Sequence, residues 1–293
     1  MKDNKKHKKA EYGILITGLI ILLAAACIIA LCAGQYSVSV PEVIKILASR
    51  FVNVTKTWSN TAEGVVFTLR LPRIIGAVLV GSALSLSGAA YQGVFKNPLV
   101  APDLLGVSSG ACVGASVAIL LHLNSFGVQA MAFVAGILAV GLTLFPRLIK
   151  NTNMTMLVLS GIIVKGIMDS VMGIIKYVAD PETELQSITY WQLGSLTKVL
   201  PKDLFTVGPV IVAASVIIFL LRWRINILSL GDREAKTLGV SVTVVRNFII
   251  ICATLLTASA VCISGTIGWI GLVIPHFARM LTGPDNTKVI PAS

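Results

Sequence analysis

The sequence predicts an all-α fold: a polytopic helix bundle that is integral to a membrane. Of the 293 residues, 55% are hydrophobic and only 13% are charged, against about 25% charged in soluble domains. The mean hydropathy is +0.87. Because a soluble fold of this size could not bury so much apolar surface, we expect long stretches of the chain to face lipid.

Seven apolar runs are long enough to cross the hydrocarbon core, which takes about 20 helical residues. In chain order they cover residues 13–33, 74–95, 104–121, 127–145, 154–178, 204–221 and 242–264. An eighth run, 267–281, is short and contains glycine and proline, so we expect a broken or re-entrant helix there. The prediction is therefore about seven full spans and one short broken helix.

The first run follows a basic segment with five lysines, residues 1–12. Its apolar core exceeds the roughly 7–15 residues of a typical signal peptide, so we expect an uncleaved first helix. The predicted organisation is a basic cytoplasmic tail, 1–12, followed by a single transmembrane domain, 13–293.

The distribution of lysine and arginine predicts which side of the membrane each connection faces. If the N-terminus is cytoplasmic, the connections on that side hold 15 of the 24 basic residues and those on the other side hold seven. Cytoplasmic connections of membrane proteins carry such an excess. Basic residues beside anionic lipid also account for the net charge of +11 without a nucleic-acid partner.

Neither a cofactor nor a metal site is expected. The five cysteines all lie inside apolar runs and form no CxxC pair, and the three histidines are scattered. Cysteines in such positions are typical of small buried apolar residues. The pattern indicates neither a disulfide framework nor a metal cluster.

Polar, glycine and proline residues recur in three parts of the chain. Residues 69–114 read LRLPRIIGAVLVGSALSLSGAAYQGVFKNPLVAPDLLGVSSGACVG, residues 191–195 read WQLGS, and residues 265–279 read GTIGWIGLVIPHFAR. These motifs and their spacing resemble the permease subunits of ABC importers for iron–siderophore complexes, haem and cobalamin, the FecCD-type permeases. The resemblance runs from about residue 70 to the end of the sequence.

The resemblance implies a fold of about ten spans, and about two helices of that pattern are absent after residue 279. It also implies a location in the plasma membrane of a prokaryote. A shortened or truncated permease, including a remnant without transport function, is one alternative for this chain.

Arg70 and Arg73 lie at the predicted outer end of the second span. In the family, arginines of the RLPR motif receive acidic side chains of an extracytoplasmic solute-binding protein, so the resemblance implies that both residues dock that protein. Complementary charge speeds such encounters. The alternative is that both arginines anchor the helix at the membrane surface.

The longest charged connection contains the segment at about residues 225–241. The resemblance implies a coupling helix that fits a groove on cytoplasmic ATP-binding subunits, and the alternative is a solvated loop. The residues that match the family segment or lie within it are Leu230, Gly231, Asp232, Glu234, Ala235, Leu238 and Gly239. Because the chain has no GxxxxGK[ST] phosphate loop, the ATPase must be a separate chain.

Two stretches combine proline, glycine and asparagine beside predicted spans. Such residues interrupt helices, and irregular backbone near a membrane is tolerated only where protein or water satisfies it. These stretches are either tight turns or bent segments beside a solute pathway. The candidate pathway residues are Gln92, Asn97, Pro98, Gly268, Gly271, Pro275 and His276.

Lys165 and Asp169 are charged residues inside the fifth span, where the family is usually small and apolar. Charge in a membrane helix is costly and marks a pathway or an internal pair. At positions i and i+4 the two side chains can reach each other, which favours a self-neutralising pair. The alternative is that this helix face lines the pathway and contacts an anionic chelate.

The predicted function is that of a permease subunit of an ABC importer, which moves an iron chelate to the cytoplasm. Among iron chelates, a siderophore complex is the first candidate. The permease would work as a homodimer or as a heterodimer with a second permease, and it would catalyse no bond change. Besides a truncated remnant, the alternative is a secondary transporter driven by an ion gradient through Lys165 and Asp169.

Overall fold

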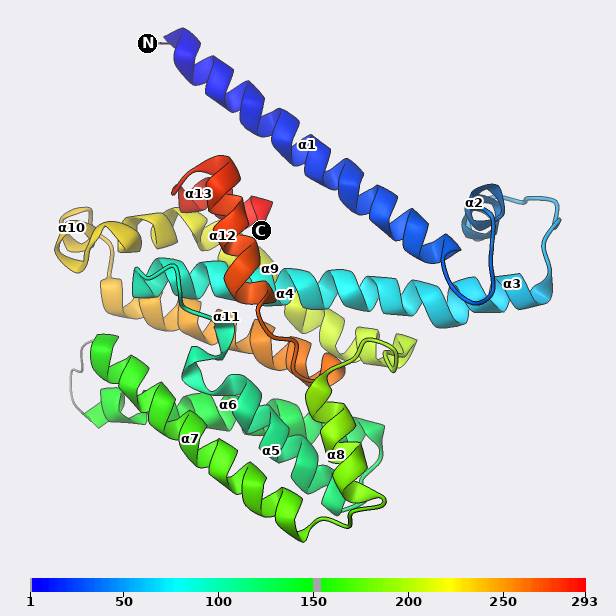
Figure 1. The fold of residues 1–293 in the computed structure, drawn as a ribbon. Coiled ribbons are helices and arrows are strands. Elements are labelled where there is room, and N and C mark those ends of the chain that lie inside the picture. The colour runs from blue at the N-terminus through cyan, green and yellow to red at the C-terminus, as the bar shows by residue number, and fades with distance from the viewer. Residues whose placement is uncertain (1, 150–153) are drawn as a thin grey trace.

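The computed structural model describes residues 2–149 and 154–293, with side chains described for residues 10–146 and 154–293. Within these ranges the chain consists of helices and connections, without a strand. The all-α prediction is therefore confirmed, and the helices form an elongated bundle (Figure 1). The side chains of the first nine residues of the predicted basic tail lie outside the described residues.

The helices follow one another with short connections. The first half of the chain forms α1 (Lys2–Cys32), α2 (Val40–Ala48), α3 (Asn60–Gly64), the π-helical η1 (Val65–Arg70), α4 (Leu71–Phe95), the 3₁₀ turn η2 (Pro102–Leu105), α5 (Val107–Leu120) and α6 (Ser125–Ile149). The second half forms α7 (Met154–Val178), α8 (Glu184–Leu193), α9 (Pro201–Leu230), α10 (Asp232–Thr237), α11 (Val242–Ser264), α12 (Ile270–Thr282) and α13 (Asn286–Ala292).

Six helical stretches of the described chain are long and apolar enough to cross a membrane. They are Ala10–Cys32, Asn60–Phe95, Ser125–Pro146, Met154–Val178, Pro201–Leu230 and Val242–Ser264. The third predicted run is represented by the 14-residue α5, because η2 and Gly106, in the left-handed region at φ 80°, occupy its start. The short last run, predicted as a broken or re-entrant helix, is the 13-residue α12, which contains Pro275 and is separated from α11 by an irregular linker.

Helix α11 lies at the centre of the bundle, where 78% of its apolar window is buried. It packs against α4, α9, α6 and α5. Two polar contacts join it to α4: Tyr91 Oη lies 2.9 Å from Thr254 Oγ1, and Thr257 Oγ1 donates to Ser87 Oγ at 3.1 Å. These groups satisfy one another inside the apolar core, which is the condition for burying them.

Helices α5 and α6 pack at close range because α5 presents glycines to its neighbour. A Cβ atom on Gly110 would lie 2.5 Å from Ala139 Cβ, and one on Gly114 would lie 2.3 Å from Met131 O. Small residues let helix backbones approach where lipid provides no hydrophobic driving force. The pair forms one side of the bundle, next to α7 (Figure 1).

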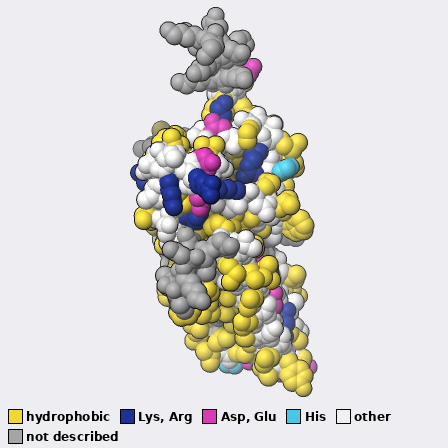
Figure 2. All heavy atoms as spheres, turned by 90° about the vertical axis from the view of Figure 1, so that its left-hand side faces the viewer, with side chains coloured by type: hydrophobic (Ala, Val, Ile, Leu, Met, Phe, Trp, Pro, Cys, Tyr) yellow, Lys and Arg dark blue, Asp and Glu magenta, His cyan; other side chains and the backbone are white. Residues whose placement is uncertain are grey.

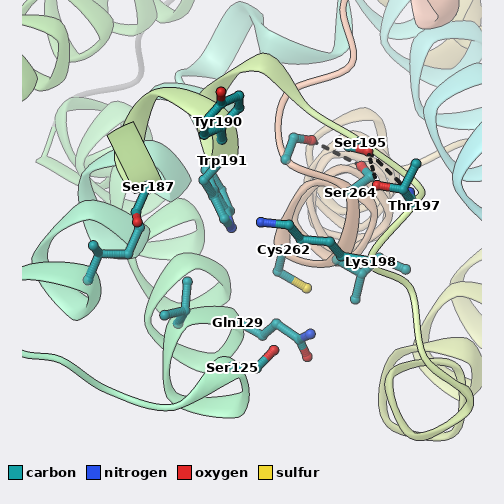
Figure 3. A pocket seen from close by; sticks show the side chains of 14 residues that line it. Ser125, Gln129, Ser187, Tyr190, Trp191, Ser195, Thr197, Lys198, Cys262 and Ser264 are labelled. Atoms are coloured by element: carbon teal, nitrogen blue, oxygen red, sulfur yellow. Dashed lines mark hydrogen bonds between the residues drawn. The ribbon is translucent and has the colours of Figure 1, made fainter. Parts of the chain in front are cut away.

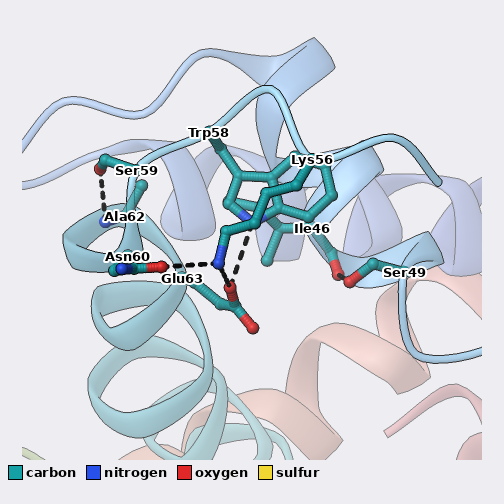
Figure 4. Close-up of polar contacts among 8 residues, drawn as sticks. All are labelled: Ile46, Ser49, Lys56, Trp58, Ser59, Asn60, Ala62 and Glu63. Carbon is teal, nitrogen blue, oxygen red and sulfur yellow. Dashed lines mark hydrogen bonds and ion pairs between the residues drawn. The ribbon is translucent and has the colours of Figure 1, made fainter.

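Helix α1 stands apart from the bundle along most of its length (Figure 1), and only 6% of its apolar window is buried. Its C-terminal end joins α2, α3 and η1 in a separate small core. This core consists of Leu31, Val38, Val43, Ile46, Trp58, Ala62 and Val66. Glu63 accepts hydrogen bonds from Lys56 Nζ at 2.7 Å and from Trp58 Nε1 at 3.3 Å (Figure 4), which orders the connection before α3.

Candidate functional site

The connection between α4 and α5 is irregular and firmly held. Helix α4 ends at Phe95, and the next residue, Lys96, adopts the left-handed conformation at φ 54°. Asn97 Oδ1 then accepts a hydrogen bond from Leu99 N at 2.9 Å, a local turn that competes with helix. Pro102 opens η2, so the proline and asparagine positions break the helix as the sequence predicts.

Gln92 connects this segment to α12. Its Nε2 donates to Val100 O at 3.1 Å and to Leu272 O at 3.4 Å, and the residue is 2% exposed. The side chain therefore holds the α4–α5 connection against the first turn of α12. Gln92 does not line the central cavity that is described below.

The linker between α11 and α12 is held by the C-terminal end of α8 and the two residues that follow it. Ser195 N donates to Ser264 O at 2.6 Å, and Thr266 Oγ1 donates to Gln192 O. Gly194 and Gly265 have positive φ, and a Cβ atom on Gly265 would lie 2.2 Å from Trp191 O. Only glycine fits this close approach of two backbones. We call the contact between residues 191–195 and 264–266 the clasp.

Both irregular segments face α7 across a cavity of about 330 Å³, the central cavity. Its polar lining is Asp103, Ser108, Ser109, Lys165, Asp169, Gln192, Thr257 and Thr266. Two carboxylates and one ammonium therefore line a hollow beside α7, a helix that is long enough to span a membrane. Ionisable groups in such positions mark pathways or internal pairs.

Lys165 pairs with Asp103 in place of the expected partner Asp169. Lys165 Nζ lies 2.7 Å from Asp103 Oδ2, while Asp103 Oδ1 accepts from Ser108 N at 2.8 Å in the first turn of α5. Asp103 thus joins η2, α5 and α7. It was missing from the residues predicted as pathway candidates, although an acidic residue just before a helix is an N-terminal capping signal.

The other predicted pathway residues divide into two groups. Gly268 and Gly271 line the central cavity. Five others do not line it: Gln92, Asn97, Pro98, Pro275 and His276. Of these, Gln92 and Pro275 are buried, and the other three are exposed.

Arg70 and Arg73 differ in their surroundings although both line one surface hollow near the end of α1. Arg70 Nη1 donates to Leu31 O at 2.6 Å and to Cys32 O at 3.2 Å, and its Nη2 donates to Tyr36 O. Arg70 therefore caps the C-terminus of α1, where cations are favoured. Arg73 is exposed.

The segment predicted to couple to the ATPase forms α10 between two glycines, Gly231 and Gly239, that both have positive φ. Ala235 is fully buried, whereas Leu230 and Leu238 are 65% and 57% exposed. This end of the bundle, the α10 end, gathers basic and acidic side chains over its upper part (Figure 2). The opposite end, which carries α8, is the α8 end (Figure 1).

Asp232 attaches α10 to the bundle. Its Oδ1 lies 2.7 Å from Arg246 Nη2 in α11 and 3.3 Å from Lys96 Nζ at the end of α4. The hydrogen bond from Arg246 is the main reason that the pKa of Asp232 lies below its usual range. The short helix is thus tied by charge to two membrane-spanning helices.

Comparisons with known proteins agree with this architecture. The chain matches the FecCD transport family over residues 21–293. It is 37% identical over 285 residues to the molybdate import system permease protein of Haemophilus influenzae, which covers 97% of this chain and 84% of the relative. A probable iron chelatin transport system permease protein of Helicobacter pylori is 40% identical over 229 residues, 78% of this chain and 69% of the relative.

The fold is also similar to a solved structure. A proposed metal-chelate type ABC transporter in an inward-facing conformation has a TM-score of 0.85 and 34% sequence identity, and the match covers 96% of this chain and 85% of that one. The arrangement of spans, irregular segments and short surface helices is therefore that of a known class of membrane protein.

Proposed function

The chain belongs to the FecCD transport family and is a permease subunit of an ABC importer. We propose that it carries an iron chelate into the cytoplasm, with a siderophore complex as the first candidate. A permease moves its cargo without making or breaking covalent bonds, so the chain is not an enzyme. Iron chelates are supported by the Helicobacter pylori relative and by the metal-chelate transporter of similar fold.

The central cavity is the observation that carries the proposal. Lys165 and Asp169 line it from α7, and Asp103 lines it from η2. A chelate with acidic oxygens would exchange with Asp103 for the Lys165 ammonium as it passes, since an ammonium donates to any oxygen acceptor. Alternating access would then open the cavity to one side of the membrane at a time.

The partners follow from the importer class. An ABC permease works with ATP-hydrolysing subunits and a solute-binding protein, and we place their contacts at opposite ends of the bundle. Leu230 and Leu238 are exposed apolar side chains that flank the charged α10, which suits insertion into a groove of the ATPase. Arg73 is an exposed cation at the other end, suited to an acidic docking protein.

In this arrangement the α10 end and the N-terminus face the cytoplasm of a prokaryote, and the bundle lies in the plasma membrane. Segment 225–241 is then the coupling segment of a single transmembrane domain, 13–293. A second permease, identical or related, completes the pathway as a dimer partner.

A second cargo has specific support. The Haemophilus influenzae relative, which is similar over nearly the whole chain, is named for molybdate. An oxyanion would use the same ammonium donor but would need less room than a chelate.

Uptake measurements separate the two cargos. We expect cells that express the chain with its own ATPase and binding protein to take up a radiolabelled ferric siderophore, and Lys165→Met to reduce that uptake. Uptake of molybdate without the ferric complex would instead support the oxyanion. Unchanged uptake and selectivity in Lys165→Met would contradict a cargo contact at Lys165.

A further inference from the structure

A second cavity, with a volume of about 550 Å³, lies at the α8 end of the bundle; we call it the outer cavity. Its walls come from the end of α5, the start of α6, α8, the connection before α9 and the end of α11. This volume lies within the range of small-molecule sites, about 300–1,000 Å³. None of the docking, coupling or pathway residues discussed above lines it.

Two groups that can only donate hydrogen bonds converge in the outer cavity. They are the ammonium of Lys198 and the indole N–H of Trp191, and in Figure 3 their nitrogens point toward each other across the hollow. In the described part of the chain neither nitrogen has a hydrogen bond or an ion pair. Two donors that face each other are complementary to an acceptor placed between them.

An acidic side chain in contact with this wall, Asp203, is already engaged. Gln129, which lines the outer cavity, donates from Nε2 to Asp203 Oδ1 at 3.0 Å. The other carboxylate oxygen, Oδ2, accepts from Leu200 N at 2.9 Å, and Asp203 is 4% exposed. The lining of the cavity contains no aspartate or glutamate, so its single charged group is Lys198.

The outer cavity adjoins the central cavity through the clasp. Trp191 and Gly265 line the outer cavity, while the next residues in each segment, Gln192 and Thr266, line the central cavity. The two cavities therefore lie on opposite sides of the same pair of backbone segments. An anion held in the outer cavity would lie across the clasp from the central cavity.

We propose that the outer cavity is an anion-binding site, in which Lys198 and Trp191 hold an oxygen-rich anion: an oxyanion or a carboxylate group. Ser125 and Tyr190 add hydroxyl groups to the same wall. As a waiting site for the anionic part of the cargo, it rests on the proposed function. The phosphate of a lipid headgroup has the same chemistry and is the other source of such an anion.

Calorimetric titration tests the site directly. The complete transporter, in nanodiscs of phosphatidylcholine alone, is titrated with molybdate and with ferric citrate. Because a hydrogen bond to a charged group is strong, Lys198→Met is expected to weaken binding by at least about tenfold, and Trp191→Phe to weaken it by less. Lys198→Arg keeps the charge and should retain binding.

Lys202 provides the matched control, since it is an exposed lysine at the start of α9 that does not line the cavity. Lys202→Met should bind both probes as the parent does. Equal weakening in Lys198→Met and Lys202→Met would overturn the proposal, because it would indicate a general effect of surface charge.

A second experiment identifies the source of the anion. If lipid fills the site, the unmodified transporter retains phosphatidylglycerol through detergent exchange and the Lys198→Met variant does not. Lys198-dependent binding of either a free probe or this lipid supports the site, and the absence of both overturns it. Loss of uptake with intact probe binding would count against the proposed function alone, so the two failures are distinguishable.

Discussion

Asp103 is the residue on which the geometry of the central cavity depends. One of its oxygens pairs with Lys165 and the other caps α5. The pairing spans 62 residues, so a local i, i+4 rule applied to α7 could not find it. The sequence alone therefore predicted charged residues in the span and missed the partner that neutralises Lys165.

Separating the two roles of Asp103 gives the first prediction. Asp103→Asn keeps a cap for Ser108 N but leaves Lys165 without its carboxylate. Because the pair is partly exposed, we expect a loss of roughly 1 kcal/mol in apparent stability, measured by thermal unfolding in detergent. The double variant Asp103→Asn/Lys165→Met should recover most of it, and strictly additive losses would contradict a direct pairing.

Asp232 gives the second prediction, on pH dependence. Its pKa is lowered in the folded protein, so its stabilising contribution is present above the ordinary aspartate value of about 3.9 and is lost as the pH falls through the lowered pKa. Between about pH 7 and pH 5 the Asp232 carboxylate therefore stays ionised, and we expect it to cause no change in the association of the unmodified protein with its ATPase. Asp232→Asn should weaken association throughout that range.

The control for Asp232 is Asp180, another aspartate with a lowered pKa, held by Thr183 before α8. Asp180→Asn should leave ATPase association unchanged, since it lies outside the α10 end. Co-purification of the ATPase across the pH range measures both variants. Equal loss in the two would contradict a local anchoring role for Asp232.

At the scale of elements, α12 packs against α4 and η2 only because glycine occupies the contact. A Cβ atom on Gly271 would lie 2.1 Å from Pro102 Cγ and 2.6 Å from Leu84 O. Gly271→Ala is therefore expected to cost about 1–3 kcal/mol in stability. Gly268→Ala is the matched control, because nothing lies within 4 Å of its Cβ position; a comparable loss there would contradict the packing argument.

The attachment of α1 gives a prediction that separates the two arginines. Arg70→Ala removes the cap of α1 and should increase hydrogen exchange in residues 29–36, whereas Arg73→Ala should leave that exchange unchanged. Arg73→Ala should instead weaken binding of the solute-binding protein, measured by surface plasmon resonance. Binding that depends on Arg70 alone, with α1 exchange unchanged, would reverse these assignments.

The long apolar helices were predictable in detail. Residues 154–178 and 242–264 match α7 and α11 as observed, because an unbroken apolar run has few other options in a membrane. Helices α2, α3 and α8 were not predicted, since they are short segments of mixed polarity inside connections. Helix α5 is shorter than predicted because the left-handed Gly106 and η2 precede it.

At the scale of the whole molecule, the sequence motifs and the fold lead to the same family. The match over residues 21–293 and the similarity to a solved ABC transporter support an importer permease. The cargo could not be predicted from these features, because relatives of similar identity are named for molybdate and for iron chelatin. The charged side chains that line the central and outer cavities are the ones on which we propose that cargo choice depends.

The energy source is the central claim, and transport by reconstituted vesicles tests it most directly. Vesicles that contain the chain, its dimer partner and its ATPase are supplied with the loaded binding protein outside and ATP inside. We predict uptake that requires ATP, stops when the ATPase is inactivated, and persists when proton and sodium gradients are collapsed. Uptake without ATP that follows an imposed ion gradient would contradict the account and indicate a secondary transporter.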